Sequence, residues 1–133
     1  MRALIVEDEI THRMLLQRYL RDVCAADVAV NGREAVDAFR LAMKEGEPYS
    51  LVLLDLEMPE MDGQAALVAM RDIEAQAHIP PGEEAKVLVI TAHNDQKKVC
   101  DAFFKGNAAG YVVKPAKQAS LMGLIEELGV IPH

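Results

Sequence analysis

Residues 4 to 9 read LIVEDE, three apolar residues followed directly by three acids. Carboxylates crowded in this way repel one another, and a buried one is costly unless something neutralises it. Similar short apolar runs lie at 51–54 (LVLL), 87–90 (VLVI) and 110–113 (GYVV), with a weaker one at 26–30 (ADVAV). Runs of this length, rich in Val, Ile and Leu, are typical of strands buried on both faces of a parallel sheet.

Segments with helical spacing separate these runs. Asn31 and Asp62 are placed to cap the second and third helices. The HIPPGEEA loop (78–85) ends the third helix and is expected to be a surface insertion, and Asp95 opens the fourth helix. Strands that alternate with helices indicate an α/β fold whose parallel sheet is covered on both faces. The residues expected to face the core are Ile10, Met14, Leu15 and Leu20 in the first helix, Ala35, Val36, Phe39 and Met43 in the second (32–44), Ala66, Leu67, Met70 and Ile73 in the third, Val99 and Phe103 in the fourth, and Leu121, Leu124, Ile125 and Leu128 in the fifth (117–128).

The composition fits one ordinary globular domain, since 51% of the 133 residues are hydrophobic. Lys and Arg total 14 against 21 Asp and Glu, and they form no basic cluster, so direct nucleic-acid binding is not expected. No apolar run approaches the roughly 20 residues of a membrane helix, and the N-terminus turns acidic too soon for a signal peptide. The chain is therefore expected in the cytoplasm, without membrane insertion. Cys24 and Cys100 are expected to be small buried hydrophobes in a reduced protein.

The residues that end each apolar run indicate where the chemistry lies. In an open parallel α/β sheet the carboxyl ends of the strands meet along one edge, and ligands bind there. That edge is expected to gather the acids at 7–9 and 55–57, the hydroxyl of Thr91 and the ammonium of Lys114. Clustered carboxylates suit a hard divalent cation, especially Mg²⁺, and partners that carry phosphate. Asp55 is then a candidate nucleophile toward a phosphoryl group, with Lys114 supplying charge and Thr91 a hydrogen bond.

Several motifs occur together in the chain: LIVEDE, NGREAV, LVLLDLEMPEMDG, VLVITA and GYVVKP. With them, essentially the whole chain resembles the receiver domain of bacterial two-component response regulators, of the stand-alone, chemotaxis-regulator-like kind. The resemblance implies a flavodoxin-like, doubly wound five-stranded parallel sheet of order 2-1-3-4-5 with helices on both faces. It also implies a single receiver domain over residues 1–133 with no output domain. Such a domain is a signalling switch and not an enzyme, because it assists only its own phosphorylation and dephosphorylation.

The resemblance further implies roles at the carboxyl edge. Asp55 would be the phosphoacceptor, with Mg²⁺ (or Mn²⁺) bound by Asp8, Asp55 and the backbone carbonyl of Glu57. Glu7 would assist the metal indirectly, through water or a hydrogen bond, and Lys114 would contact the phosphoryl group. The extra negative charge of Glu57 could strengthen metal binding or slow entry of the phosphodonor, and the sequence leaves both open.

Thr91 and Tyr111 resemble the switch pair of that family. In it the hydroxyl moves toward the phosphoryl group and the aromatic ring rotates inward to fill the vacated space. A cis peptide bond is implied between Lys114 and Pro115. The implied partners are a sensor histidine kinase or a histidine phosphotransfer protein, and a downstream protein effector. A homodimer through the fourth helix, fifth strand and fifth helix is also implied, on a face that carries Lys97, Lys98, Asp101, Lys105 and Lys117.

Two other functions remain open. A haloacid-dehalogenase-like phosphatase also uses an Asp nucleophile after a strand, but it requires the pattern DxDx[TV], whereas residues 55–59 read DLEMP. A phosphorylation-independent adaptor with the receiver fold would not need the acids, the hydroxyl and the ammonium together. The histidines give weaker hypotheses. His12 and His78 are interpreted as surface or helix-end residues, and His93 as a neighbour of the site that could affect attacking water.

Overall fold

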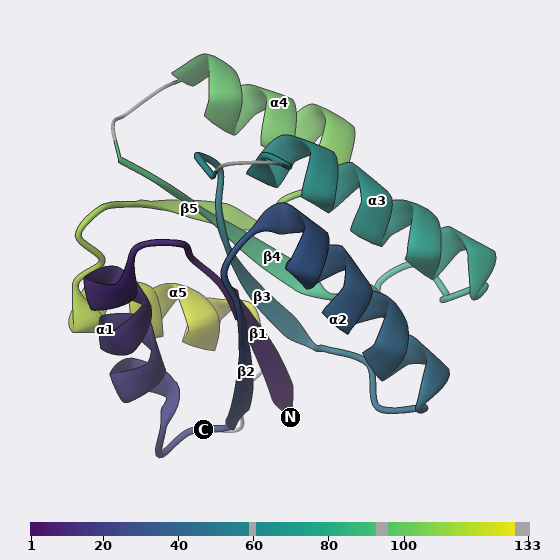
Figure 1. The fold of residues 1–133 in the computed structure, drawn as a ribbon, viewed down its shortest axis with the longest axis horizontal. Helices are drawn as coiled ribbons and strands as arrows, with labels where there is room; N and C mark the ends of the chain where they lie inside the picture. The colour runs from purple at the N-terminus through teal and green to yellow at the C-terminus, as the bar shows by residue number, and fades with distance from the viewer. Residues whose placement is uncertain (59–60, 93–95, 130–133) are drawn as a thin grey trace.

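The computed structural model describes residues 1–58, 61–92 and 96–129. Within them, five strands alternate with five helices in the predicted order (Figure 1). The strands are β1 (Arg2–Val6), β2 (Ala25–Ala29), β3 (Leu51–Asp55), β4 (Lys86–Thr91) and β5 (Gly110–Val113). The helices are α1 (Ile10–Leu20), α2 (Gly32–Lys44), α3 (Gly63–Gln76), α4 (Gln96–Gly106) and α5 (Gln118–Glu127). Asp95 and His93, both named in the sequence predictions, lie outside the described residues.

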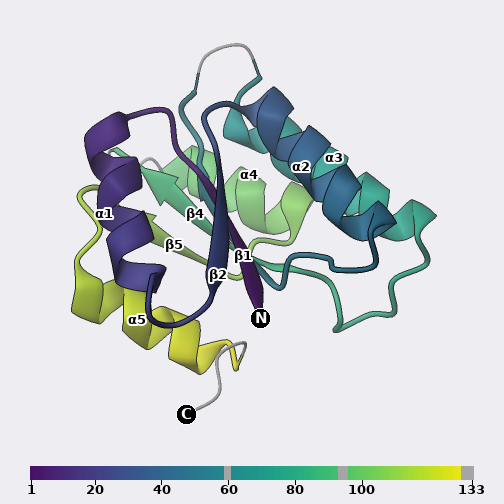
Figure 2. The same cartoon turned by 60° about the horizontal axis from the view of Figure 1, so that its bottom comes forward.

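All five strands are parallel and stand in the order β2-β1-β3-β4-β5, which confirms the predicted sheet. Helices α1 and α5 cover one face, and α2, α3 and α4 cover the other (Figure 1, Figure 2). Val6 pairs with Leu54, and Asp55 pairs with Ile90, so β1, β3 and β4 end at nearly the same level. The residues that follow these strands therefore meet at one edge of the sheet.

The side chains of the strands alternate between two core layers, one under α1 and α5 and the other under α2 and α3. The three inner strands are buried almost throughout, as the sequence predicted. The edge strands β2 and β5 are only partly buried, because each has a neighbouring strand on one side only. Val28 of β2 is 39% exposed and Tyr111 of β5 is 43% exposed, so the prediction of burial on both faces is wrong for these two strands.

Helix α1 turns a different face to the core from the one that its hydrophobic residues predicted. Ile10 and Met14 are each 61% exposed, whereas His12, Leu16 and Leu20 are buried. These three residues are spaced four apart and so lie on one face of the helix. The prediction was right for Leu20 and wrong for Ile10 and Met14, because a histidine takes an inward position.

Helices α2, α3 and α5 agree with the sequence prediction. Asn31 Oδ1 accepts the N–H of Glu34, and Asp62 Oδ1 accepts the N–H of Ala65, so both predicted caps form. The predicted inward residues of these helices are buried or partly buried in the two core layers. Their amphipathic pattern was therefore sufficient to orient them.

Helix α4 buries Val99 as predicted but leaves Phe103 38% exposed, so the prediction for Phe103 is wrong. The end of the helix lies close against α3, where a Cβ on Gly106 would collide with the side chain of Leu67. The buried face consequently runs through Val99, Ala102 and Gly106, all of them small or medium-sized. A bulky Phe103 lies beside that face and not within it.

Further predictions concerned the surface of the molecule. Both cysteines are free, but Cys100 is exposed and Cys24 only half-buried, so the expected burial is wrong for Cys100. The 78–85 loop is exposed over most of its length, and His78 lies exposed at the end of α3, as predicted. Among the described residues, the helices are all too short or too polar to cross a membrane.

Candidate functional site

Asp55 is the last residue of β3 and is 1% exposed. Its Oδ1 accepts the backbone N–H of Glu57 at 2.9 Å, and its Oδ2 accepts a hydrogen bond from Lys114 Nζ at 3.0 Å. The chain then returns closely over this strand end, since Gly63 N–H bonds the carbonyl oxygen of Leu56 and a Cβ at Gly63 would collide with the Asp55 backbone. A glycine is therefore needed where α3 begins, directly above Asp55.

Two further acids follow β1 at the same edge. Glu7 is fully buried and Asp8 is exposed. Carboxylate oxygens of Glu7, Asp8 and Asp55 all lie within 4.8 Å of one another. Hard divalent cations prefer oxygen ligands, and Mg²⁺ commonly keeps several waters beside one or two carboxylates. This donor set fits such an ion, with Asp8 on the side open to solvent.

Lys114, directly after β5, supplies the positive charge. Its Nζ lies 2.9 Å from Glu7 Oε1 and 3.0 Å from Asp55 Oδ2. Its backbone N–H donates to the carbonyl oxygen of Thr91 at 2.8 Å, which fixes the lysine against the end of β4. The peptide bond to Pro115 is cis. One ammonium thus faces two buried carboxylates.

This imbalance of charge shifts the pKa values of the two carboxyl groups in opposite directions. Burial and the neighbouring Glu7 raise the pKa of Asp55 to about 7, against the opposing effect of the Glu57 N–H and Lys114. Burial alone would also raise the pKa of Glu7, but hydrogen bonds, the strongest from His12, lower it well below its usual range. Burial by itself would lower the pKa of Lys114, and its hydrogen bonds to the two acids raise it overall. Glu7 is therefore held as an anion, whereas Asp55 is ionised with difficulty until further positive charge arrives.

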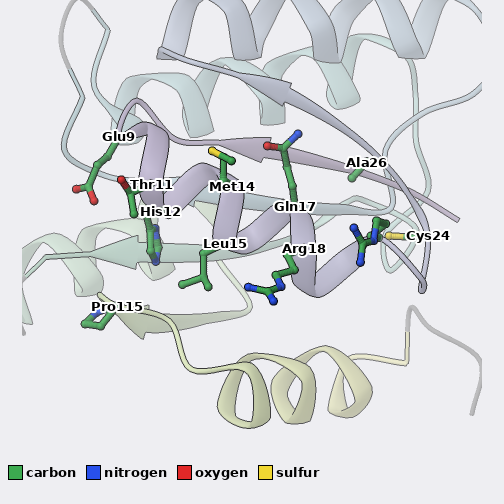
Figure 3. Close-up of a pocket in the computed structure, with 11 residues that line it drawn as sticks. Glu9, Thr11, His12, Met14, Leu15, Gln17, Arg18, Cys24, Ala26 and Pro115 are labelled. Carbon is green, nitrogen blue, oxygen red and sulfur yellow. The ribbon is translucent and has the colours of Figure 1, made fainter.

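His12 is a member of this site that the sequence did not reveal. Its ring is 4% exposed, and Nδ1 lies 2.6 Å from Glu7 Oε1. Its Nε2 accepts the backbone N–H of Ala116 at 3.1 Å. Figure 3 shows His12 and Pro115 on the wall of a groove along α1, whose volume is about 1010 Å³. The interpretation of His12 as a surface or helix-end residue is wrong, and its spacing of four from Leu16 was the signal that could have placed it inward.

Thr91 and Tyr111 lie on adjacent strands. Thr91 pairs with Val113, and Val89 pairs with Tyr111, so the two residues share a face of the sheet and are offset by one repeat of the strand. Thr91 is fully buried at the end of β4, whereas Tyr111 is 43% exposed on the edge strand β5.

The side chain of Glu57 reaches helix α4. Its Oε1 lies 3.3 Å from Lys98 Nζ, so the segment after Asp55 is linked to α4. Both side chains are partly exposed, so this ion pair contributes little to stability. The ion pair with Lys98 partly offsets the charge of Glu57, and both effects expected of that charge stay predictions.

A doubly wound sheet of order 2-1-3-4-5 with clustered acids at its carboxyl edge is the architecture of a receiver domain. The chain belongs to this family: the family model of the response regulator receiver domain matches residues 3–126. It is thus a receiver domain of two-component phosphorelay signalling, a class of signalling proteins and not of metabolic enzymes. Receiver domains bind Mg²⁺ at acidic residues, and Glu7, Asp8 and Asp55 form such a cluster here.

The chain is similar to several known proteins. It is 33% identical to the chemotaxis protein CheY of Halobacterium salinarum over 127 residues, which are 95% of this chain and 94% of that protein. It is 30% identical to the sensor histidine kinase GacS of Pseudomonas protegens over 93% of this chain, but spans only 13% of that kinase. The receiver domain of Ssk1 from Saccharomyces cerevisiae, crystallised with the histidine phosphotransfer protein Ypd1, superposes with a TM-score of 0.81 at 30% identity, covering 97% of this chain and 88% of that one.

Proposed function

We propose that this receiver domain takes a phosphoryl group from a phosphohistidine onto Asp55 and thereby changes its affinity for protein partners. The observation that carries the proposal is the placement of Lys114 Nζ, 3.0 Å from Asp55 Oδ2 and 2.9 Å from Glu7 Oε1. Phosphoryl transfer requires mainly positioning and neutralisation of charge. A buried carboxylate with an ammonium at hydrogen-bond distance supplies both.

The acids are proposed to hold Mg²⁺, and the same oxygens would accept Mn²⁺. Asp8, Asp55 and the backbone carbonyl of Glu57 are the proposed direct ligands. Glu7 acts indirectly, because its oxygens already accept hydrogen bonds from His12 and from other groups of the site. A bound divalent cation would neutralise the oxygens of the phosphoryl group during transfer.

The proposed step is a displacement at phosphorus. A carboxylate oxygen of Asp55 attacks the phosphorus atom as the P–N bond to the donor imidazole breaks, and the departing nitrogen keeps the electron pair and takes up a proton. The product is an aspartyl phosphate, which water later hydrolyses. After transfer, Lys114 pairs with the oxygens of the phosphoryl group. Its ammonium, which Glu7 and Asp55 share before the reaction, therefore moves toward the charge of that group. The domain assists these two steps on itself alone.

Thr91 and Tyr111 are the proposed switch. The Thr91 hydroxyl moves toward the phosphoryl group, and the Tyr111 ring, 43% exposed before the change, turns inward into the space released. A change of charge at Asp55 becomes a change of surface shape on β5 by this route.

The proposed phosphodonor is a sensor histidine kinase or a histidine phosphotransfer protein, as in the complex of Ssk1 with Ypd1. A protein donor needs a docking surface beside the acids, and α1 presents Ile10 and Met14 there, each 61% exposed. The downstream partner is a protein effector, or a second copy in a homodimer, bound at the face of α4, β5 and α5, where Tyr111 and Val113 of β5 are 43% and 40% exposed. A kinase partner would draw on ATP, so we propose the cytoplasm as the site of this exchange.

Mass spectrometry of the intact protein tests the proposal after incubation with Mg²⁺ and acetyl phosphate. The parent should gain one phosphoryl group, and Asp55→Asn should gain none. Asp72→Asn, which changes an exposed aspartate of α3, serves as the matched control and should gain one. No gain in the parent, or an equal gain in Asp55→Asn, would refute the proposal, and the first of these results is the one that a phosphorylation-independent adaptor would give.

A further inference from the structure

His12 makes two hydrogen bonds that join two separate parts of the site. Nδ1 lies 2.6 Å from Glu7 Oε1, directly after β1, and Nε2 lies 3.1 Å from the backbone nitrogen of Ala116, in the segment after β5. The ring is 4% exposed, so both bonds form away from water. Hydrogen bonds to a charged group in such surroundings are strong and costly to lose.

The bond with Ala116 determines which ring nitrogen carries the proton. A backbone N–H can only donate, so Nε2 of His12 must present its lone pair and carry no hydrogen. A neutral imidazole then has its proton on Nδ1, and Nδ1 donates to Glu7 Oε1. In this arrangement the Glu7 carboxylate therefore always accepts a hydrogen bond from Nδ1 of His12.

Helix α1 holds both polar groups of Ala116. Tyr19, two turns after His12 on the same helix, donates its hydroxyl to the Ala116 carbonyl oxygen at 3.0 Å. Ala116 is 2% exposed, so its N–H and C=O both require protein partners. Because Ala116 comes two residues after Lys114, these bonds tie the backbone that carries the lysine to α1.

The contacts around Glu7 form a closed circuit. His12 binds Glu7, and Glu7 binds the Lys114 ammonium through both oxygens, at 2.9 Å and 3.1 Å. The chain runs from Lys114 to Ala116, and Ala116 returns to His12. A rotation of the Glu7 carboxylate would therefore displace the ammonium that lies 3.0 Å from Asp55 Oδ2.

We propose that His12 is a positioning residue for phosphoryl transfer to Asp55, which holds the Glu7 carboxylate through Nδ1 and so presents the Lys114 ammonium to the acceptor. This inference rests on the proposed function and extends it to a residue outside the acid, threonine and lysine set. His12 acts through Glu7 and Lys114, so its loss should slow the transfer without removing the nucleophile.

The position of the ring proton can be tested without any phosphodonor. Long-range ¹H–¹⁵N correlation spectra of the ¹⁵N-labelled protein show which ring nitrogen of His12 carries hydrogen. We expect the proton on Nδ1. A proton on Nε2 would overturn the inference, because Nδ1 would then face Glu7 without a hydrogen to donate.

Two amide variants separate the two hydrogen bonds. The amide of asparagine reaches about as far as Nδ1 of histidine, and that of glutamine about as far as Nε2, so His12→Asn keeps a donor for Glu7 and His12→Gln keeps an acceptor for Ala116. The rate of phosphorylation by acetyl phosphate is measured at saturating Mg²⁺ and extrapolated to saturating donor, well below each thermal transition. His12→Ala and His12→Gln should be roughly ten- to hundredfold slower than the parent, and His12→Asn within about threefold of it.

These rates distinguish positioning from packing. If His12 only fills space, all three variants will melt at lower temperature yet react as fast as the parent, which would overturn the inference. A fast glutamine variant beside a slow asparagine variant would also overturn it, since the bond to Ala116 alone would then matter. A parent that gains no phosphoryl group would refute the proposed function itself, and the contact with Glu7 would still be tested by the spectra.

Discussion

Replacing Asp55 by asparagine should raise the stability of the cation-free protein above about pH 7, although it removes the proposed phosphoacceptor. Asp55 is 1% exposed and shares one ammonium with the buried Glu7. Burial and the Glu7 carboxyl raise the pKa of Asp55 from an ordinary 3.8 to about 7. Keeping this carboxylate ionised in the folded protein therefore costs free energy that a neutral amide of the same shape does not.

The size of the effect follows from that pKa. The difference between 3.8 and about 7, at 1.36 kcal/mol for each pH unit, gives roughly 4 kcal/mol as an upper value. Relaxation of the site and water around the Lys114 side chain screen the charge, so we expect a gain of roughly 2 kcal/mol. Because the folded-state pKa lies above that of the unfolded chain, stability present below about pH 4 is lost as the pH rises through about 7. The asparagine variant lacks this loss, so its advantage grows over that interval and then levels off.

Urea unfolding followed by far-UV circular dichroism suits this chain, which has no tryptophan. With EDTA present, the advantage of Asp55→Asn should be about half as large near pH 5.5 as above pH 7.5. Asp72→Asn should stay within about 0.5 kcal/mol of the parent. Added Mg²⁺ should stabilise the parent more than Asp55→Asn, because the variant lacks a proposed ligand. An asparagine variant that is no more stable than the parent at high pH, or equally advantaged at every pH, would refute the reasoning.

Three further predictions concern other parts of the molecule. Lys114→Ala should still be phosphorylated, although more slowly than the parent, and should no longer change its partner affinity. Normal partner binding by the phosphorylated variant in a pull-down would contradict the role of the lysine in switching. Ile10→Glu should slow transfer from a histidine phosphotransfer protein roughly tenfold and leave the reaction with acetyl phosphate unchanged. Val68→Glu, at a site 41% exposed on α3, should affect neither rate, and equal slowing by both variants would exclude α1 as the docking surface. Arg71→Met should lower the free energy of unfolding by roughly 3 kcal/mol, since it leaves the buried Glu74 carboxylate without its cation, and adding Glu74→Met should recover part of the loss in the same urea experiment.

The fold could be predicted because parallel sheets leave a simple mark in a sequence. A strand covered on both faces is apolar throughout, and the polar residue that ends it lies at the carboxyl edge. That rule brought Asp55 and Lys114 together although they are 59 residues apart in the chain, and the two form a hydrogen bond. The rule failed for the edge strands β2 and β5, which are partly exposed because one side of each faces solvent. The catalytic and switching roles of the residues at the carboxyl edge of the sheet stay predictions until phosphorylation is measured.

The helices show where hydrophobic periodicity is insufficient. In α1 the apolar residues Ile10 and Met14 face solvent while the polar His12 is buried, because a buried Glu7 carboxylate needs a donor from that helix. Nothing in the spacing of the hydrophobic residues carries this requirement, which arises only when β1 and α1 pack together. In α4 the close approach of Gly106 to α3 selects the buried face, and that approach is likewise a property of the packed structure.

The contrast between Glu7 and Asp55 explains how two similar acids can do different work. Hydrogen bonds from His12 and Lys114 lower the pKa of Glu7 although burial alone would raise it, and burial beside that anion raises the pKa of Asp55. Pairs of titratable groups whose surroundings drive their pKa values apart commonly divide the roles of a reaction between them. Here Glu7 is the fixed anion that anchors Lys114, and Asp55 is the carboxylate whose charge the site tolerates least. A bound divalent cation would relieve the repulsion at Asp55 and leave Glu7 unchanged, so its binding energy would act on the proposed nucleophile.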